Sequence, residues 1–190
     1  MQLTEIRWHG RGGQGVKTAA TLVAEVAMET GMYTQGFPEY GPERSGAPVR
    51  GFTRISDVEI RMHCAIENPD IIIVLDPSLL ETGNVCDGAK PNSVILVNTD
   101  MTPEEVRKKI KISEGKIYTL DAQTIALKEI GRPIPNIPLI GALSKITGKP
   151  AVEAIKKGIK KKFGHKFSEK VVEGNLRAIE RSYNEVKSEK

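Results

Sequence analysis

Ile6-Arg7-Trp8-His9-Gly10-Arg11-Gly12-Gly13-Gln14-Gly15-Val16-Lys17-Thr18 is the stretch that decides the fold of this chain. The pattern predicts a buried strand, a tight glycine turn and the first turn of a helix. Gly10, Gly12 and Gly15 fit the pattern G-x-G-x-x-G, in which glycines let the backbone approach a diphosphate at a helix N-terminus. We therefore predict a site for a phosphate-bearing ligand in a strand–loop–helix unit.

The residue that usually completes a dinucleotide site is missing. A Rossmann unit that binds NAD carries an acidic residue about 20 positions after the glycines, where it holds the ribose. The next predicted strand, near Tyr33-Thr34-Gln35-Gly36-Phe37, ends without such a residue, and Glu39 comes late, beyond a proline. This absence counts against a stand-alone nucleotide-binding dehydrogenase, an alternative that only the glycine motif supports.

The composition suits a globular protein. The chain has 190 residues, and 39% of them are hydrophobic, so we expect a single domain spanning residues 1–190. No apolar run approaches the roughly 20 residues of a membrane span, and the N-terminus lacks the features of a signal peptide. We expect a cytoplasmic protein. Two cysteines, Cys64 and Cys86, are too few for a zinc site or an iron–sulfur cluster, so no metal site is predicted.

The basic residues near the C-terminus could form a surface that binds nucleic acid. Lysines cluster on a predicted helix at Lys156, Lys157, Lys160, Lys161 and Lys162. An apolar stripe recurs on the same helix at helical spacing, formed by Val152, Ile155, Ile159 and Phe163. The lysines are therefore interpreted as the solvated face of an amphipathic helix. Without interleaved aromatic residues for base stacking, we expect no nucleic-acid partner.

Predicted strands and helices alternate along most of the chain. This pattern predicts an α/β protein with three α/β/α layers around a mainly parallel, Rossmann-like sheet. Besides the strand before the glycines and the one near 33–37, strands are expected at Asp70–Asp76, Ser93–Asn98 and Lys116–Leu120. Two short runs, Val49–Ser56 and Val58–Cys64, predict an inserted β-hairpin around Asp57. The last third is predicted to be helical, with helices at about Leu139–Thr147, Ala151–Phe163 and Ser168–Ser188.

Polar residues follow the predicted central strands. Asp76, Thr102 and Asp121 are each interpreted as N-caps of the helices that follow. Asp76, Asn98 and Asp121 would also meet at the carboxyl edge of the sheet, where such folds bind ligands. An N-cap role alone explains an aspartate at such a turn, so both interpretations stay open.

Two proline-rich segments interrupt the pattern. Gly131–Pro138 is predicted to be a rigid extended loop, because three prolines disfavour a helix or a central strand. Phe37–Pro48 also contains three prolines, together with Glu39, Arg44 and Ser45. Such stiffness suits a surface that holds a ligand or another subunit, because little conformational entropy is lost on binding.

These segments together resemble the gamma subunit of the archaeal and bacterial 2-oxoacid:ferredoxin oxidoreductases, the pyruvate synthase group. The matching stretches are His9–Gly15, Phe37–Pro48, Glu67–Asp70 and Pro135–Leu143, so the resemblance covers nearly the whole chain. It implies an α/β/α subunit that works in a complex with alpha, beta and delta subunits. Within that family the complex oxidatively decarboxylates a 2-oxoacid with coenzyme A, giving acyl-CoA, CO2 and reduced ferredoxin, or catalyses the reverse reaction.

The resemblance also implies where the redox chemistry occurs. Thiamine diphosphate, Mg2+ and the [4Fe-4S] clusters are expected on the partner subunits, with ferredoxin as the electron acceptor and no catalytic residue on this chain. Pyruvate is favoured as the 2-oxoacid by resemblance alone. We expect this subunit to help hold coenzyme A beside the intermediate that its partners generate. A purely structural role in assembling the complex is the alternative.

The candidate cofactor-binding residues are Gly10, Arg11, Gly12, Gly13, Gln14, Gly15, Lys17, Glu39, Arg44, Ser45 and Asn136. The glycine-loop amides, Arg11 and the helix N-terminus would receive phosphate charge, with Lys17 adding a point charge. Glu39, Arg44 and Ser45 would shape the ligand channel or the subunit seam, and Asn136 would supply a fixed amide. Alternatively, the glycines only permit tight packing. His9 either donates to a phosphate or is a satisfied structural residue.

Overall fold

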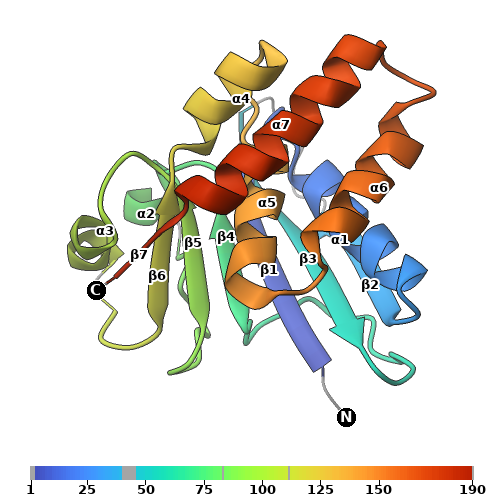
Figure 1. Ribbon diagram of the computed structural model, residues 1–190. Helices are drawn as coiled ribbons and strands as arrows, with labels where there is room; N and C mark the ends of the chain where they lie inside the picture. The colour runs from blue at the N-terminus through green and yellow to red at the C-terminus, as the bar shows by residue number, and fades with distance from the viewer. Residues whose placement is uncertain (1–2, 40–45, 83, 111, 190) are drawn as a thin grey trace.

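The computed structural model describes residues 3–39, 46–82, 84–110 and 112–189, which form one twisted sheet flanked by helices (Figure 1). The sheet has seven strands in the order β2-β3-β1-β4-β5-β6-β7. The strands are β1 (Leu3–Arg11), β2 (Tyr33–Glu39), β3 (Pro48–Ser56), β4 (Ile71–Val74), β5 (Val94–Asn98), β6 (Lys116–Leu120) and β7 (Lys187–Ser188). The central pairs β1–β4, β4–β5 and β5–β6 are parallel. The pairs β1–β3, β2–β3 and β6–β7 are antiparallel.

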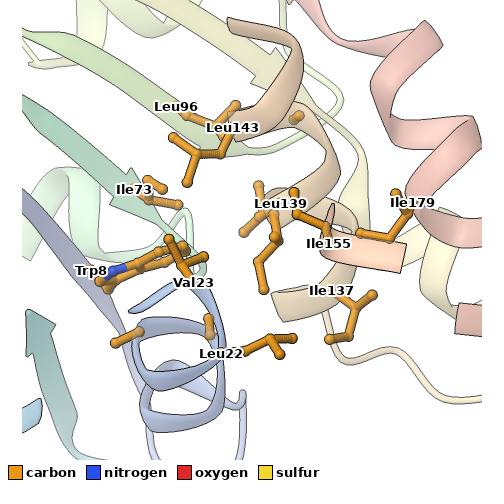
Figure 2. Packing of buried hydrophobic residues seen from close by; sticks show 14 of the residues in the cluster. Trp8, Leu22, Val23, Ile73, Leu96, Ile137, Leu139, Leu143, Ile155 and Ile179 are labelled. Atoms are coloured by element: carbon orange, nitrogen blue, oxygen red, sulfur yellow. The ribbon is translucent and has the colours of Figure 1, made fainter. Parts of the chain in front are cut away.

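Helices cover both faces of the sheet. They are α1 (Val16–Glu29), α2 (Leu79–Thr82), α3 (Pro103–Ile110), α4 (Ala122–Ile130), α5 (Asn136–Thr147), α6 (Val152–Phe163) and α7 (Glu169–Glu185). Apolar residues of α1, α5, α6 and α7 pack with Trp8 and Ile73 in the larger core, and Figure 2 shows this packing from close by. A smaller core joins α2 and α3 to the opposite face of the sheet. The predicted three-layer α/β/α architecture is therefore confirmed.

The prediction of a β-hairpin around Asp57 is wrong in its second strand. Val58–Cys64 forms no strand, and most of its residues are exposed. The antiparallel partners of β3 are β2 on one side and β1 on the other. Both hydrogen-bonding edges of β3 are therefore occupied, which leaves no edge for the segment after Asp57 to join. The antiparallel character that the sequence indicated is present, but it comes from β2.

The C-terminal third differs from the prediction in two places. Helix α5 already begins at Asn136, so Gly131–Pro138 is not extended throughout. Pro138 is tolerated because amides in the first turn of a helix have no intrahelical acceptor to lose. Helix α7 ends at Glu185, three residues before the predicted end, and Lys187–Ser188 adds a short antiparallel strand to β6. A two-residue strand has no sequence signature, so the pattern could not predict it.

Two of the three predicted N-caps are confirmed. Asp121 accepts a hydrogen bond from the amide of Thr124 at the start of α4. Thr102 and Glu105 form a reciprocal capping box at α3, with distances of 2.7 and 3.3 Å. Asp76 is not the N-cap of α2, because that helix begins only at Leu79; Asp76 accepts from both the amide and the hydroxyl of Ser78 in the turn before the helix. These contacts fix the turns at the carboxyl ends of β4, β5 and β6.

Candidate functional site: the glycine loop and its groove

The loop between β1 and α1 needs glycine at two positions for packing. A Cβ atom at Gly10 would lie 2.6 Å from Cγ2 of Val16, so the strand could not approach the helix. Gly15 has a φ of 80°, and a Cβ there would lie 2.4 Å from Nδ2 of Asn136. Glycine at these positions therefore follows from internal packing, whatever the loop binds.

The loop leaves donors at its exposed tip. The amides of Gly12 and Gln14 are occupied, because they donate to the carbonyls of Ala47 and Arg11 at 3.2 and 3.1 Å. Among the residues that the structure describes, no acceptor is assigned to the amides of Gly13, Gly15 and Val16. No acidic residue lies in the first turn of α1. Free amides and the positive end of the helix dipole make this tip suitable for an anion.

Side chains brace the loop from the β4 side. Gln14 accepts a hydrogen bond from the amide of Arg11 at 2.8 Å and donates to Asp76 at 2.8 Å. The guanidinium of Arg11 donates to Ser78 and to the carbonyl of Gly46, and it lies 3.4 Å from Asp76. Burial opposes ionisation of Asp76, but hydrogen bonds from Ser78 and Gln14 outweigh it and lower the pKa of the carboxyl group. Gln14 thus positions the loop, while half-buried Arg11 remains near its tip.

The structure brings some of the other predicted residues to the loop. Lys17 is exposed in the first turn of α1. Asn136 is buried and lies with its Nδ2 atom 3.4 Å from the carbonyl of Gly15, so it braces the turn from α5. Glu39 is not at the loop tip, because it pairs with Arg50 at the end of β2. Arg44 and Ser45 lie outside the described residues.

His9 faces a separate cavity on the other side of β1. This cavity of about 420 Å³ is lined by Arg7, His9, Glu39, Pro48, Val49, Arg50, Leu79, Asn84, Val85 and Asp87. His9 accepts a hydrogen bond from Nε of Arg7 at 3.0 Å. Burial, with the nearby charges of Arg7 and Arg50, lowers the pKa of His9 to about 3. A neutral imidazole with this partner is a satisfied structural residue.

The neutral His9 predicts a pH dependence of stability. The unfolded histidine has a pKa near 6.5, so as the pH falls toward the folded value of about 3 the unfolded state takes up a proton that the folded state excludes. The free energy of unfolding should therefore fall by about 3 kcal/mol between pH 7 and pH 4 from this group alone. Urea titrations across that range should show a smaller fall for His9→Gln, because glutamine can still accept from Arg7. The exposed His165 provides the matched control, and an equal slope for His165→Gln and His9→Gln would contradict the assignment.

A groove of about 480 Å³ begins at the glycine loop and runs beside α5, α6 and α7. Its lining residues are Gly13, Gly15, Thr18, Ile130, Arg132, Ile134, Asn136, Ile137, Lys162, Phe163, Lys166, Phe167, Val171 and Asn175. Of these residues, the sequence predicted only Gly13, Gly15 and Asn136 as ligand contacts. It missed the others, among them Arg132 and the residues between 162 and 175. Helical periodicity explained Phe163 as core and Lys162 as solvated face. Nothing in that pattern shows that the end of α6 lies next to the loop.

Neither a metal-binding cluster nor a membrane-spanning helix occurs among the described residues. No group of three or more His, Cys, Asp or Glu side chains in that part of the chain could hold a metal ion. Within the same residues, every helix is too short or too polar to cross a bilayer.

The fold and the loop define a class of protein. Residues 5–185 match the pyruvate ferredoxin/flavodoxin oxidoreductase family, and the chain belongs to that family. It is 51% identical over 183 residues to the pyruvate synthase subunit PorC of Thermotoga maritima, covering 96% of this chain and 94% of that protein. It is 45% identical to the pyruvate/ketoisovalerate oxidoreductases common subunit gamma of Thermococcus kodakarensis, covering 96% of each chain. The predicted resemblance is thereby confirmed.

Solved structures agree with this assignment. The crystal structure of pyruvate oxidoreductase subunit PORC from Thermotoga maritima matches with a TM-score of 0.89, 47% identity and full coverage of both chains. A 2-oxoglutarate:ferredoxin oxidoreductase from Magnetococcus marinus, solved with 2-oxoglutarate, coenzyme A and succinyl-CoA bound, matches with a TM-score of 0.76 over 96% of this chain and 30% of that one. At 22% identity, that second likeness shows a shared fold.

Proposed function

We propose that this chain is the gamma subunit of a multisubunit pyruvate (2-oxoacid):ferredoxin oxidoreductase, and that its glycine loop holds the diphosphate of coenzyme A. Relatives named as pyruvate synthase subunits and as common gamma subunits support the place in the complex. Thiamine diphosphate, Mg2+, the [4Fe-4S] clusters and the contact with ferredoxin are assigned to the alpha, beta and delta partners. A cytoplasmic location accompanies this assignment.

The observation that carries the ligand-binding part is a set of amides at the loop tip to which no acceptor is assigned among the described residues. Gly13, Gly15 and Val16 offer N–H groups at the start of α1, and the loop tip is open to solvent at Gly12 and Gly13. Arg11 adds a cation beside them. Donors and a cation at an exposed helix N-terminus match the charge of a diphosphate.

Such a site would act by positioning. A thiol held beside a reactive carbon reacts in an effectively unimolecular step, which removes much of the entropic barrier. Thiamine diphosphate on the partners supplies the decarboxylation chemistry. The residues of this chain therefore need only bind the charged end of coenzyme A and fix its orientation, and none of them needs to transfer a proton.

A matched pair of glycine substitutions tests the proposal. Gly13 and Gly31 both have positive φ values, 93° and 89°, and a Cβ atom at either would meet nothing within 4 Å. Alanine at either site should cost about 1 kcal/mol of stability through backbone strain. In the assembled oxidoreductase, Gly13→Ala should raise the KM for coenzyme A at least about tenfold, because it crowds the approach to the amides. Gly31→Ala, at the far end of α1, should leave that KM unchanged.

Two alternatives remain as outcomes of this test. If Gly13→Ala lowers the melting temperature as Gly31→Ala does but leaves the KM unchanged, the subunit serves assembly alone. Internal packing at Gly10 and Gly15 gives that alternative a specific basis. The dehydrogenase alternative is disfavoured by topology, because β3 lies between β1 and β2. The end of β2 therefore does not lie beside the glycine loop as the ribose-binding strand of a Rossmann unit does.

A further inference from the structure

Helices cover only one half of the sheet face that lies opposite α1. Helices α2 and α3 pack on β4, β5 and β6, on the side of the sheet away from β2 (Figure 1). On the β2–β3–β1 half, irregular chain after Ser56 forms part of the cover. Gln35 donates to the carbonyl of Met62 at 2.8 Å, and Nη2 of Arg54 contacts Sγ of Cys64 at 3.8 Å. Beyond this cover lies the cavity of about 420 Å³ that His9 faces, here called the His9 cavity.

Three polar side chains form a row on this face near the carboxyl end of β1. His9 lies directly opposite Arg50 in the β1–β3 pairing, and Arg50 lies directly opposite Glu39 in the β2–β3 pairing. Side chains of directly opposite residues share a face of the sheet, with their Cβ atoms about 5 Å apart. All three residues line the His9 cavity. The row therefore presents its polar groups to one space.

Two donors of this row have no acceptor assigned among the described residues. Nε2 of His9 accepts from Nε of Arg7, so the neutral ring carries its proton on Nδ1, and that N–H group is unassigned. Arg50 donates to Glu39 through Nε and Nη2, which leaves Nη1 without an assigned acceptor. His9 is only 7% exposed. A buried N–H group without an acceptor costs free energy, which an occupant that accepts its hydrogen bond would recover.

The charges around His9 favour an anionic occupant. The N–H groups of Arg7 donate to His9 and to four backbone carbonyls, so no described carboxylate pairs with this buried cation. Burial lowers the pKa of His9, and the charges of Arg7 and Arg50 lower it further. The carboxylates in the lining are Glu39, which is paired with Arg50, and Asp87, which is exposed. An acceptor with a negative charge therefore fits the two open donors.

The position of the cavity indicates the source of that group. His9 directly precedes Gly10, so the cavity lies at the same edge of the sheet as the glycine loop but on the other side of β1. In the proposed function, coenzyme A held at this edge reacts with an intermediate on a partner subunit, so that partner must reach the edge. We infer that a partner subunit of the oxidoreductase inserts a carboxylate side chain into the His9 cavity, where it accepts from Nδ1 of His9 and Nη1 of Arg50. This inference rests on the proposed function, because the coenzyme is what brings the partner to this edge.

Removing the two charges of the Arg50–Glu39 pair one at a time tests the sign of the partner's charge. The measured quantity is the Kd of this chain for the remaining subunits of the oxidoreductase, obtained by biolayer interferometry. Arg50→Gln should raise this Kd at least about tenfold, because the inserted carboxylate loses a charged donor. Glu39→Gln should lower it about threefold, because it frees Arg50 and removes a like charge. Both side chains are partly exposed, so neither substitution should impair folding.

A third variant and a control pair complete the design. His9→Gln keeps an acceptor for Arg7 but has no donor at the position of Nδ1, so it should raise the Kd about threefold. Lys161 and Glu29 form an ion pair on the opposite face of the sheet, between α6 and α1. Lys161→Gln and Glu29→Gln should each change the Kd by less than about twofold. With the other subunits in excess over the Kd, Arg50→Gln should keep the wild-type KM for coenzyme A.

Opposite shifts of the Kd in Arg50→Gln and Glu39→Gln support the inference, because an ion pair that only holds the sheet edge would weaken binding in both variants. Equal losses, or an unchanged Kd in both, overturn it. Tighter binding in Arg50→Gln with weaker binding in Glu39→Gln also overturns it, because the partner would then supply a cation. A raised KM for coenzyme A in Arg50→Gln would assign this residue to the coenzyme and likewise overturn the inference.

The proposed function fails or stands by a different measurement. If Gly13→Ala raises the KM for coenzyme A while neither Kd changes, the loop proposal stands and the His9 cavity is not a docking site. If Gly13→Ala leaves that KM unchanged while the two Kd values shift in opposite directions, the loop proposal fails and the docking of a partner carboxylate stands.

Discussion

Replacing Arg7 with methionine is expected to lower the free energy of unfolding by about 3–5 kcal/mol. The side chain is 3% exposed, and its Nε atom donates to His9. Its terminal nitrogens donate to four backbone carbonyls, those of Ile66, Glu67, Val85 and Asp87. Methionine fills a similar volume but leaves these buried acceptors without donors, and each costs about 1–3 kcal/mol before relaxation. Chemical denaturation followed by circular dichroism measures the loss.

Two further variants identify the cause of this loss. Arg7→Lys keeps the charge but offers one nitrogen in place of three, so it should recover less than half of the stability. Arg61→Met removes an exposed arginine paired with Glu59, with 85% of the arginine side chain exposed, and should change stability by less than about 0.5 kcal/mol. A full recovery in Arg7→Lys would mean that charge, and not the geometry of the guanidinium, supports the fold.

The second large effect is expected at Trp8. This side chain is fully buried, and it lies in the core between the sheet and the helices α1 and α5 (Figure 2). Trp8→Ala should cost about 3–5 kcal/mol, because it removes a large apolar contact area and leaves a cavity. Its Nε1 atom also donates to the hydroxyl of Thr53 at 3.0 Å. Trp8→Phe keeps most of the ring volume but loses that bond, so it should cost about 1–2 kcal/mol.

The exposed Met28 provides the control for this pair. Truncation of Met28, which is 58% exposed, should change stability by less than about 0.5 kcal/mol. Because Trp8 is the single tryptophan of the chain, unfolding of all variants is best followed by circular dichroism. Equal losses in Trp8→Ala and Trp8→Phe would show that the hydrogen bond to Thr53 dominates over packing.

Elements of the fold that depend on neighbouring residues could be predicted from local sequence patterns. The β-branched run before Asp76 predicted β4, and the capping box at Thr102 and Glu105 predicted the start of α3. Strand pairing is decided by contacts between distant residues, and the prediction failed there. The alternation in Val58–Cys64 is typical of a strand, yet both edges of β3 were already occupied. Helix α5 similarly began inside a proline-rich segment, because its first turn needs no amide donors.

The candidate site could likewise be predicted only where its sequence signal is local. The glycine motif located the loop, and its spacing placed the turn correctly between β1 and α1. Sequence spacing could not show that Gln14 and Asn136 brace the turn, or that Glu39 pairs with Arg50 away from it. It also could not place Arg132 and Phe167 near Gly13, because they are more than a hundred residues apart in sequence.

The contact between Gly15 and Asn136 means that the glycine motif of this chain is not a portable module. The turn owes part of its shape to a side chain that arrives 121 residues later, from a helix held in place by α7. A shortened polypeptide ending before residue 131 would keep every letter of the motif and yet lack one wall of the loop. Transplanting the motif into another scaffold would therefore require the first turn of α5 to be carried along with it.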